Sequence, residues 1–414
     1  MGNDAAMRGG AVVATVNDGG ALWYNPGGLG AVRRNQLDMT TSVYSLRLYR
    51  APGFMRSAQG ESTDLAVSEF VTAPMQISYV RPLAPGVTLG LGYFSPRASK
   101  LLLRERLNAP APPYNSDWVA DITSTSAEYG FGAGVGWVAA RDLRLGAGLM
   151  LRWESVTEQV DFMGTVDLNG AFVQIVQVGG LLTQNIIGVE PVAGLQWDAT
   201  ENLTLGVNVR GPRLSLVNSG EQSNRITVAD QFTDLLAADT ELEDVSNTAV
   251  SLVRWGRYYA GMAYDWDVNS VSFDADFQGK IVNDDAGVRR KLQWNARIGY
   301  SREMSKVVTA GVGLFTDRGS DETGDHSLFV PGTNFYGGTL GMQLSNEHLL
   351  AESEDADTIV FSSVFALRYA FANTETESLV VDASEVEPLD MLDVQRSELS
   401  IHEIGLYVGS GLHF

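Results

Sequence analysis

Apolar residues recur at every second position along most of this chain. Between Leu143 and Trp153 the odd-numbered residues are apolar, and the residues between them are small or charged apart from Met150. A period of two residues is that of a β-strand with one apolar face. The same contrast runs from Tyr129 to Trp137, where glycine fills the second face. A soluble sandwich would carry Lys, Glu and Thr there, so the glycines indicate a crowded interior.

The alternation predicts an all-β fold, a 14-stranded antiparallel transmembrane β-barrel. Short turns such as 140–142 and 198–202 alternate with longer segments, which is typical of barrels in the outer membrane. The fourteen predicted strands are 36–48, 74–82, 86–104, 122–138, 143–162, 186–198, 203–217, 249–266, 270–282, 291–303, 307–317, 333–345, 358–372 and 398–414.

Three tryptophans support an orientation in a membrane. Trp137, Trp197 and Trp266 each end a predicted strand on its apolar phase, directly before a short turn. A row of indoles at one height is what an interfacial girdle requires. The last strand alternates up to Phe414, as in terminal strands that the outer-membrane assembly machinery recognises. We therefore expect a bacterial outer-membrane location, with lipid and lipopolysaccharide around the barrel and that machinery as a partner.

The N-terminal stretch differs from the rest of the chain. Residues 18–30 read DGGALWYNPGGLG, and this density of glycine and proline permits neither a regular helix nor a long strand. A compact irregular segment is expected. We predict that residues 1–35 form a hatch, or plug, inside the lumen and that residues 36–414 form the barrel.

The opening segment resembles the FadL family, outer-membrane transporters of long-chain fatty acids and other hydrophobic compounds. The resemblance lies in residues 8–11 (RGGA), 17–18 (ND) and 23–29 (WYNPGGL). The family has a glycine-alanine run, an Asp-rich step and Asn-Pro-Ala followed by Gly-Leu at these places. The predicted strand number, the hatch and the terminal Phe414 agree with the family along the whole chain.

The resemblance implies passive uptake of a hydrophobic small molecule. In the family, the ligand binds in an apolar groove between long loops, passes to a lumen pocket, and leaves through the wall or past the hatch. The wall opening is an inward kink in the third strand. Pro96 lies within the predicted third strand, and because proline cannot donate to the ladder it predicts a bulge or gap there. The alternative interpretation is that this strand ends early.

Candidate site residues in the hatch are apolar or turn-forming. Leu22, Trp23 and Leu29 are expected to anchor the hatch and to line the pocket. Asn25 and Pro26 either initiate a turn that shapes the hatch or respond to ligand. Both interpretations of the Asn-Pro pair stay open at the level of sequence.

On the barrel wall, candidates are residues that break the lumen-facing pattern. Phe94, Met150 and Phe315 are apolar on a phase that is otherwise small or polar, so they are candidates for ligand contact. Charged residues on the same phase are expected to form ion pairs that stiffen the interior. Alternatively, one arginine holds a ligand carboxylate. The charged residues are Arg144, Arg152, Arg210, Arg297, Glu128, Glu154, Asp274 and Asp276.

Two long segments on the long-loop side are rich in apolar residues. Segments 164–185 and 218–247 would expose this surface unless they pack together or form a capture groove, and a short amphipathic helix is predicted at 232–238. The acidic segments 352–357 and 375–393 lack calcium-ligand spacing, so solvated loops are expected there.

Composition excludes several function classes. The chain has 29 Lys and Arg against 50 Asp and Glu, a formal net charge of -21, which argues against nucleic acid as a partner. It has no cysteine for a disulfide framework. Its four histidines lack metal-ligand spacing and no catalytic motif occurs, so we expect no enzyme activity, no metal and no cofactor.

The sequence contains no apolar run of about 18 residues, so no transmembrane helix is predicted. No signal peptide opens the sequence, as expected of a mature form or of a chain with a new start methionine. The predicted function is passive transport of a hydrophobic small molecule, a long-chain fatty acid or similar. The alternative is a structural or interaction component of an outer-membrane assembly, with another envelope protein as its partner.

Overall fold

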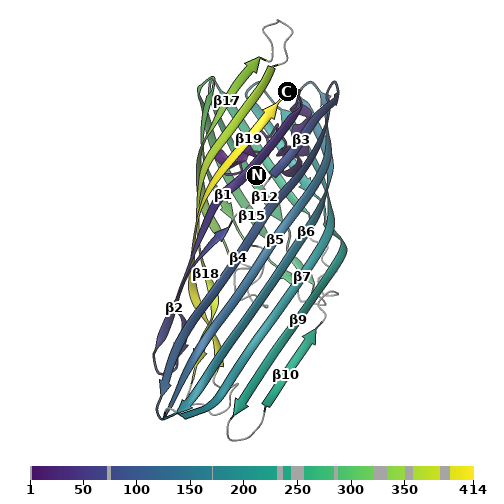
Figure 1. Cartoon of the computed structure of the whole chain (residues 1–414). Helices are drawn as coiled ribbons and strands as arrows, with labels where there is room; N and C mark the ends of the chain where they lie inside the picture. The colour runs from purple at the N-terminus through teal and green to yellow at the C-terminus, as the bar shows by residue number, and fades with distance from the viewer. Residues whose placement is uncertain are drawn as a thin grey trace.

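The strands of this protein close into a barrel. The structure, a computed structural model, describes residues 2–71, 76–169, 171–230, 236–243, 256–283, 288–319, 333–349, 358–382 and 392–414. Strand β1 (Gln36–Ser57) pairs antiparallel with β19 (Leu392–His413) on one side and with β3 (Gln76–Ala84) on the other. The first and last strands of the chain therefore lie side by side and complete the ring (Figure 1).

The described residues of this sheet form 17 strands, which pair antiparallel apart from a short parallel contact between β1 and β18. Around the ring from β3, the order is β4, β5, β6, β7, β8, β11, β12, β15, β16, β17, β18 and β19. Their bounds are β4 Val87–Ala111, β5 Tyr114–Ala140, β6 Leu143–Leu168, β7 Ala171–Asp198, β8 Leu203–Arg210, β11 Arg257–Trp266, β12 Asn269–Gln278, β15 Gln293–Ser305, β16 Val308–Asp317, β17 Phe335–Leu349 and β18 Thr358–Val381.

Further strands extend or flank this ring. Strand β2 pairs with residues 45–56 of β1, and β9 pairs with residues 174–189 of β7. Strand β10 in turn pairs with β9. A separate two-stranded sheet consists of β13 and β14. Their bounds are β2 Ser62–Val71, β9 Leu214–Asp230, β10 Leu236–Glu243, β13 Ile281–Asn283 and β14 Val288–Arg290.

Helical structure is confined to the beginning of the described chain. It consists of α1 (Asn3–Met7), α2 (Ala21–Tyr24) and the 3-10 helix η1 (Pro26–Ala31). Within the parts of the chain that the structure describes, no helix is both long and apolar enough to cross a membrane. Residues 2–35, here called the N-terminal segment, precede β1 directly and lie within the upper part of the barrel (Figure 1).

The predicted short turns are confirmed, whereas the predicted long loops are partly wrong. Strands β5 and β6 are separated by 141–142 only, and β7 and β8 by 199–202. By contrast, β6 and β7 continue through most of 164–185, and β4 and β5 continue through most of 105–121. Hydrogen-bonded ladders extend there because the inward faces of these strands find apolar partners.

Other sequence predictions on this side also need correction. Residues 49–73, which lie between the first two predicted strands, contain the end of β1 and the whole of β2. Residues 236–238 begin strand β10 rather than a helix, and 375–381 belong to β18 rather than to an acidic loop. The rest of the predicted helix, 232–235, and the acidic segment 352–357 lie outside the described residues.

Predicted and described strands do not correspond one to one. The predicted strand 203–217 is divided into β8 and β9 at 211–213, and β2 was not predicted as a strand. The closed all-β barrel is confirmed by the pairing of β1 with β19 and β3. The count of fourteen stays a prediction.

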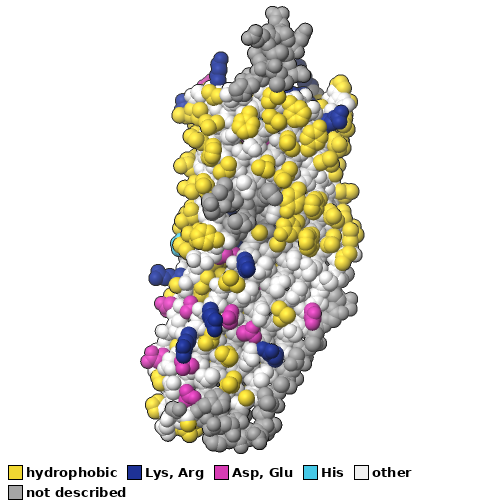
Figure 2. Space-filling view, in the orientation of Figure 1, with side chains coloured by type: hydrophobic (Ala, Val, Ile, Leu, Met, Phe, Trp, Pro, Cys, Tyr) yellow, Lys and Arg dark blue, Asp and Glu magenta, His cyan; other side chains and the backbone are white. Residues whose placement is uncertain are grey.

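Apolar side chains form a belt around the half of the barrel nearest the chain termini (Figure 2). Charged side chains gather on the other half in that view. Trp137, Trp197 and Trp266 are exposed at the ends of β5, β7 and β11, just before short turns. The predicted aromatic row at the short-turn end of the belt is therefore confirmed as an exposed row.

A second aromatic row, which the sequence analysis did not predict, marks the other edge of the belt. The rings of Tyr93 and Tyr129 have centroids 6.3 Å apart, and those of Tyr129 and Trp153 are 5.3 Å apart. From Tyr129 to Trp137, at ~3.4 Å per residue and a tilt of about 40°, β5 spans roughly 20 Å along the barrel axis. This is close to the apolar band of a membrane barrel, about 25 Å.

Beyond the second aromatic row, the barrel interior is filled by side chains. The distal apolar cluster comprises Phe54, Leu103, Trp118, Val176, Leu379 and their neighbours, which come from β1, β4, β5, β7 and β18. Phe54 and Trp118 have no more than 1% of their surface exposed. The inward apolar residues of 164–185, such as Val176, therefore contribute to a packed interior, whereas Ile175 and Leu181 of the same segment are exposed.

The belt predicts a difference between two equally exposed leucines. Leu149 on β6 lies within the belt and is 57% exposed, and Leu102 on β4 lies beyond it and is 58% exposed. We expect Leu149→Arg to lower the free energy of unfolding in phospholipid vesicles by about 2–4 kcal/mol, because the guanidinium would face hydrocarbon. Leu102→Arg should cost less than about 1 kcal/mol. Equal losses in denaturant titrations of the two variants would contradict this placement of the bilayer.

Candidate functional site

The N-terminal segment is held across the lumen by strands from opposite sides of the barrel. Helix α1 contacts β16, β17, β18 and β19, and η1 contacts β4, β5, β6 and β7. Thr339 donates its hydroxyl to the carbonyl of Met7 at 2.8 Å, and Ser272 donates to the carbonyl of Ala11 at 2.7 Å. Asp274 accepts the backbone N–H groups of Val12 and Val13 at 2.6 and 2.9 Å. Side chains of the wall thus satisfy backbone groups that lie far from water.

Asn25 fixes the centre of the segment. Its side-chain oxygen accepts the N–H of Gly27 at 3.0 Å, which caps η1, and Pro26 occupies the first turn. Its amide nitrogen donates to the carbonyls of Val13 and Leu195 at 2.8 and 2.9 Å. The side chain is fully buried. The predicted shaping role of Asn25 and Pro26 therefore has a structural basis, and a response to ligand stays a prediction.

Glycines on the strands let the backbone of the segment approach the wall. A Cβ atom added to Gly146 would lie 2.2 Å from the carbonyl oxygen of Pro26, and one on Gly136 would lie 2.5 Å from the nitrogen of Gly30. Since real Cβ atoms do not come this close to backbone, these positions exclude side chains. The glycine face read from the sequence is the surface against which the N-terminal segment packs.

Five predicted site residues meet in one group, the central apolar cluster of Leu22, Trp23, Leu29, Phe94 and Met150. The rings of Trp23 and Phe94 have centroids 5.5 Å apart at 38°. All but the half-buried Trp23 are at most 3% exposed. Two segments distant in sequence thus supply one apolar surface, in agreement with the lumen phase assigned to Phe94 and Met150.

Phe315 and Pro96 lie elsewhere. Phe315 on β16 is buried under the guanidinium of Arg368, whose Cζ lies 4.4 Å from the ring centroid, and it is not part of the central apolar cluster. Pro96 is half-buried in β4, where pairing with β5 skips from Phe94 opposite Gly130 to Arg97 opposite Glu128. Two residues of β4 therefore oppose one of β5, so the predicted bulge is confirmed. Because β4 continues to Ala111, the alternative of an early strand end is wrong.

The neighbours of β4 on its other side are β3 and β2. Strand β4 pairs with β3 up to Phe94 opposite Gln76, the first described residue of β3. Beyond the bulge, the N–H of Lys100 on β4 donates to the side chain of Glu69 on β2. A side-chain carboxylate of the neighbouring strand thus accepts a backbone N–H of β4 there.

Buried ion pairs separate the central and distal apolar clusters. The ion-pair layer consists of Glu128, Arg152, Glu154, Glu190, Arg210 and Arg213. On β6, for example, Arg152 and Glu154 follow Met150 of the central cluster and precede Val166 of the distal cluster. The predicted ion pairing of Arg152 with Glu128 is confirmed.

Each arginine of the layer contacts two glutamates or a glutamate and the N-terminal segment. Arg210 lies 3.0 Å from Glu190 and donates to the carbonyl oxygen of Trp23. Arg152 contacts Glu128 and lies 3.5 Å from Glu190. The guanidinium carbons of Arg152 and Arg210 are 4.8 and 4.1 Å from the centroid of the Trp23 ring. These cation–π contacts tie the layer to the central apolar cluster.

Two members of the layer were not singled out from the sequence. Arg213 lies 3.0 Å from Glu154 and 3.2 Å from Glu128. Its odd number places it on the outward phase of a continuous strand, and only the break between β8 and β9 turns it inward. Glu190 lies seven residues before the outward-facing Trp197 on β7, and an odd separation places the two on opposite faces of a strand. Strand parity alone could therefore have identified Glu190 as inward-facing.

Two further groups of ion pairs line other parts of the wall. Arg257 donates to Asp276 at 2.7 Å, and Arg297 lies 2.6 Å from the same carboxylate. On the opposite side, Arg47 and Arg368 lie 2.7 and 2.5 Å from Glu403. Predicted pairs with Arg297 and Asp276 are therefore confirmed. Arg144 pairs with Asp198 at the short-turn end instead.

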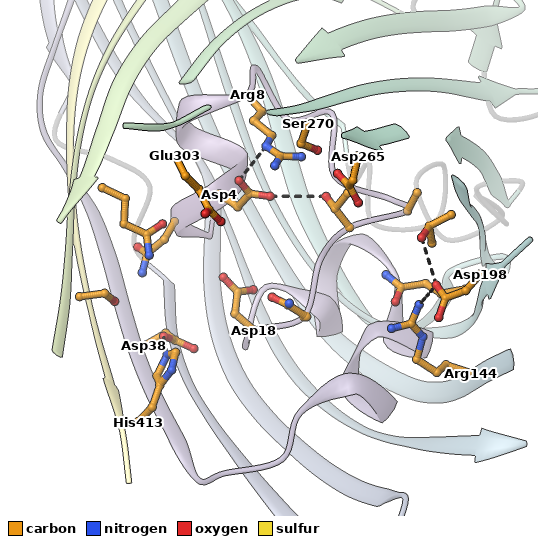
Figure 3. A pocket seen from close by; sticks show the side chains of 18 residues that line it. Asp4, Arg8, Asp18, Asp38, Arg144, Asp198, Asp265, Ser270, Glu303 and His413 are labelled. Carbon is orange, nitrogen blue, oxygen red and sulfur yellow. Dashed lines mark hydrogen bonds and ion pairs between the residues drawn. The ribbon is translucent and has the colours of Figure 1, made fainter. Parts of the chain in front are cut away.

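A polar cavity of about 460 Å³ lies at the short-turn end, between the N-terminal segment and the wall (Figure 3). Asp38 of β1 and His413 of β19 lie side by side in it, with Nε2 of His413 3.8 Å from Oδ1 of Asp38. Among the described residues, no group of His, Asp and Glu has the arrangement of a metal site. The charged residues that line the cavity are Asp4, Arg8, Asp18, Asp38, Arg144, Asp198, Asp265, Glu303 and His413.

Asp18 of the N-terminal segment borders this cavity and has a perturbed pKa. Its Oδ1 accepts the N–H of Gly20 at 2.8 Å. Burial of the carboxylate within the barrel, followed by the negative charge of Asp38, raises the pKa of Asp18 to about 7. Asp4 acts in the same direction and His413 in the opposite one. The protonated carboxyl is thus favoured when the segment is docked.

The contact between glycine and backbone can be tested with two alanine substitutions. We expect Gly146→Ala to displace the N-terminal segment, because the added methyl group would overlap the backbone of Pro26. Gly130→Ala is the matched control, since its Cβ would lie 3.6 Å from the Trp23 ring, an ordinary contact. Hydrogen exchange of residues 2–35 should accelerate at least about tenfold in the first variant only. Similar exchange in both would contradict the steric account.

Docking of the segment should depend on pH through Asp18. Its pKa is raised above the ordinary value of an undocked carboxyl, so docking takes up a proton between about pH 4 and 7. The stability of docking is therefore greatest at low pH and is lost as pH rises through 7. Hydrogen exchange of residues 2–35, corrected for intrinsic rates, should show less protection at pH 8.5 than at pH 5.5. Asp18→Asn should flatten this dependence, and an unchanged slope would refute the assignment.

Comparisons with known proteins give a fold but no sequence match. No protein-family model matches the chain, and no curated protein matches it significantly.

Solved structures resemble it over nearly its whole length. A FadL homologue from Pseudomonas aeruginosa matches at TM-score 0.63 and 11% identity, covering 99% of this chain and 98% of that one. The P. putida toluene transporter TodX matches at TM-score 0.63 and 13% identity, with coverage of 100% and 98%. The Ralstonia pickettii toluene transporter TbuX matches at 0.52 and 11%, with coverage of 100% and 98%. The closed barrel and these structures together assign this chain the FadL-like fold.

Proposed function

We propose that this chain is a passive channel of the bacterial outer membrane for hydrophobic small molecules. In this proposal residues 1–35 act as a hatch in a barrel formed by residues 36–414. Cargo passes from the distal half of the barrel to the central apolar cluster. It leaves the lumen sideways at the bulge of β4, next to Pro96. The hatch keeps the lumen closed to ions and polar solutes during this passage.

The observation that carries the proposal is the central apolar cluster. Leu22, Trp23 and Leu29 of the N-terminal segment face Phe94 and Met150 of the wall, between the ion-pair layer and the polar cavity. Wall residues of a barrel have no need of apolar side chains inside a polar lumen. An apolar surface shared between the segment and the wall suits an apolar ligand, because the ligand would compete with the side chains of the segment for the same wall residues.

The position of the bulge supports a sideways exit. Pro96 follows Phe94 of the central apolar cluster by two residues, and the pairing of β4 with β5 is interrupted at this level. A gap here would open from the cluster toward the apolar belt and so toward lipid. An apolar molecule moving by this route would avoid the polar cavity at the short-turn end.

The names of the similar structures support a hydrophobic cargo. TodX is described as a toluene transporter and CymD as a monoaromatic hydrocarbon channel, and CymD matches at TM-score 0.54 and 12% identity. Long-chain fatty acids are the other cargo that the sequence resemblance suggests. The proposal also takes lipid and lipopolysaccharide as the surroundings of the belt. The assembly machinery is expected to recognise the terminal strand β19.

Uptake measurements test the channel and its exit together. In a Gram-negative host without a comparable protein, expression of the chain should raise the initial rate of toluene uptake several-fold. Deletion of Pro96 leaves one residue between Phe94 and Arg97, so β4 and β5 would pair one for one and the bulge would close. We expect this deletion to return uptake to the rate of the host alone, with heat-modifiable migration showing that the barrel still folds.

Pro96→Ala is the matched control because it keeps the extra residue in β4. Its uptake rate should stay above about half that of the wild type. Undiminished uptake by the deletion variant would contradict the sideways exit. Absence of uptake by the folded wild type, in the same assay, would contradict the proposed function itself.

A further inference from the structure

We infer that the cargo of this channel is uncharged, because glutamates already match the arginines beside the central apolar cluster and carboxylates dominate the cavity beyond it. The inference rests on the proposed function and narrows its substrate class. It separates aromatic or aliphatic hydrocarbons from fatty acids, which carry a carboxylate at neutral pH.

The described residues of the ion-pair layer next to the cluster carry equal numbers of positive and negative charges. The layer contains three arginines and three glutamates among the described side chains. Glu190 contacts both Arg152 and Arg210, at 3.5 and 3.0 Å, and Arg213 lies within 3.2 Å of two glutamates. Each of the three arginines is at most 6% exposed. The layer therefore presents pairs that are already formed.

A ligand carboxylate would disturb these pairs in either of two ways. It could displace a glutamate, which would leave that glutamate buried without its cation, or it could lie beside a glutamate at close range. Both arrangements place unmatched negative charge in a buried site, where the effective dielectric constant is low. The planes of Arg152 and Arg210 are occupied as well, since both lie over the Trp23 ring. An uncharged ligand meets none of these costs.

The polar cavity provides a second and independent argument. Six carboxylates line it, against two arginines and one histidine. Figure 3 shows Asp4, Asp18, Asp38, Asp198, Asp265 and Glu303 distributed around the cavity rather than on one side. The potential inside such a concave acidic surface repels anions. An anionic ligand at the central apolar cluster would thus lie between the ion-pair layer and this acidic cavity, even though the sideways route does not pass through the cavity.

The surface left for the cargo is apolar and aromatic. Trp23 and Phe94 offer ring edges and faces, and Leu22 and Met150 offer aliphatic and thioether groups. These groups have no hydrogen-bonding partner to offer a charged head group apart from the indole N–H. Recognition at this place would then depend on shape and burial, as expected for hydrocarbons.

Matched ligands test the inference. The full-length protein in lipid nanodiscs would be titrated at pH 7.5 with toluene, benzoate and benzylammonium, with empty nanodiscs as the partition control. These probes share a ring and differ in charge. We expect toluene to bind at least about tenfold more tightly than benzoate or benzylammonium. Equal or tighter binding of either ion would overturn the inference but leave a hydrophobic channel standing. Failure of all three to bind would instead refute the proposed function and the inference with it.

A single substitution should shift this preference. Glu190→Gln removes the carboxylate shared by Arg152 and Arg210, and so takes one negative charge out of the layer. The ratio of benzoate affinity to toluene affinity should rise about tenfold. Glu201→Gln, on an exposed turn, is the matched control and should leave the ratio unchanged. An unchanged ratio in Glu190→Gln would overturn the inference. Should that variant fail to fold, Glu154→Gln, beside Arg213, carries the same expectation.

Discussion

Backbone can meet backbone inside a barrel only where the strands carry no side chains. In this protein the N-terminal segment crosses the lumen at positions such as Gly136, Gly146 and Gly313, where even one methyl group would overlap its main chain. Backbone groups of the segment then reach wall side chains such as Asp274 and Thr339. The same close approach brings Leu22 and Trp23 against Phe94. The candidate site is therefore a consequence of the glycine-lined wall.

The interior is layered along the barrel axis by polarity. Four layers follow one another from the end opposite the short turns to the short-turn end. They are the distal apolar cluster, the layer of buried ion pairs, the central apolar cluster and the polar cavity. Buried ion pairs contribute little net stability, but they fix geometry because breaking one leaves an unmatched charge. Here they hold Trp23 in place through Arg152 and Arg210. The layer thus connects the position of the segment to the wall strands β5, β6, β7 and β8.

Much of the fold could be predicted because strand alternation is a local signal. Outward Trp137 and inward Phe94 and Met150 follow from parity alone, and the bulge at Pro96 follows from a missing N–H donor. Parity fails where the strand itself is interrupted. Arg213 follows the break at 211–213, so its inward direction depends on pairing of β9 with β7, which no local pattern encodes. This is why one cation of the ion-pair layer was missed.

At the end of the barrel opposite the short turns, strands were predicted as loops for a related reason. Segments such as 164–185 contain apolar residues without strict alternation and carry an Asn-Gly turn signal at 169–170, which is typical of a loop. In the structure their inward residues, for example Val166 and Val176, pack against Phe54 and Trp118 from distant strands. Such partners are set by tertiary contacts. Likewise, Phe315 shares the inward phase of Phe94 but lies under Arg368 on another part of the wall.

The seam between β1 and β19 has a consequence for how the molecule is made. Asn35 and Phe414 exchange two backbone hydrogen bonds, at 3.0 and 2.9 Å, so the last residue of the chain meets the residue just before the first strand. The ring cannot be completed until the final strand is in place. The N-terminal segment is attached directly ahead of that seam, so completion of the ring places its point of attachment beside β19. Closure of the barrel therefore also fixes the place from which the segment enters the lumen.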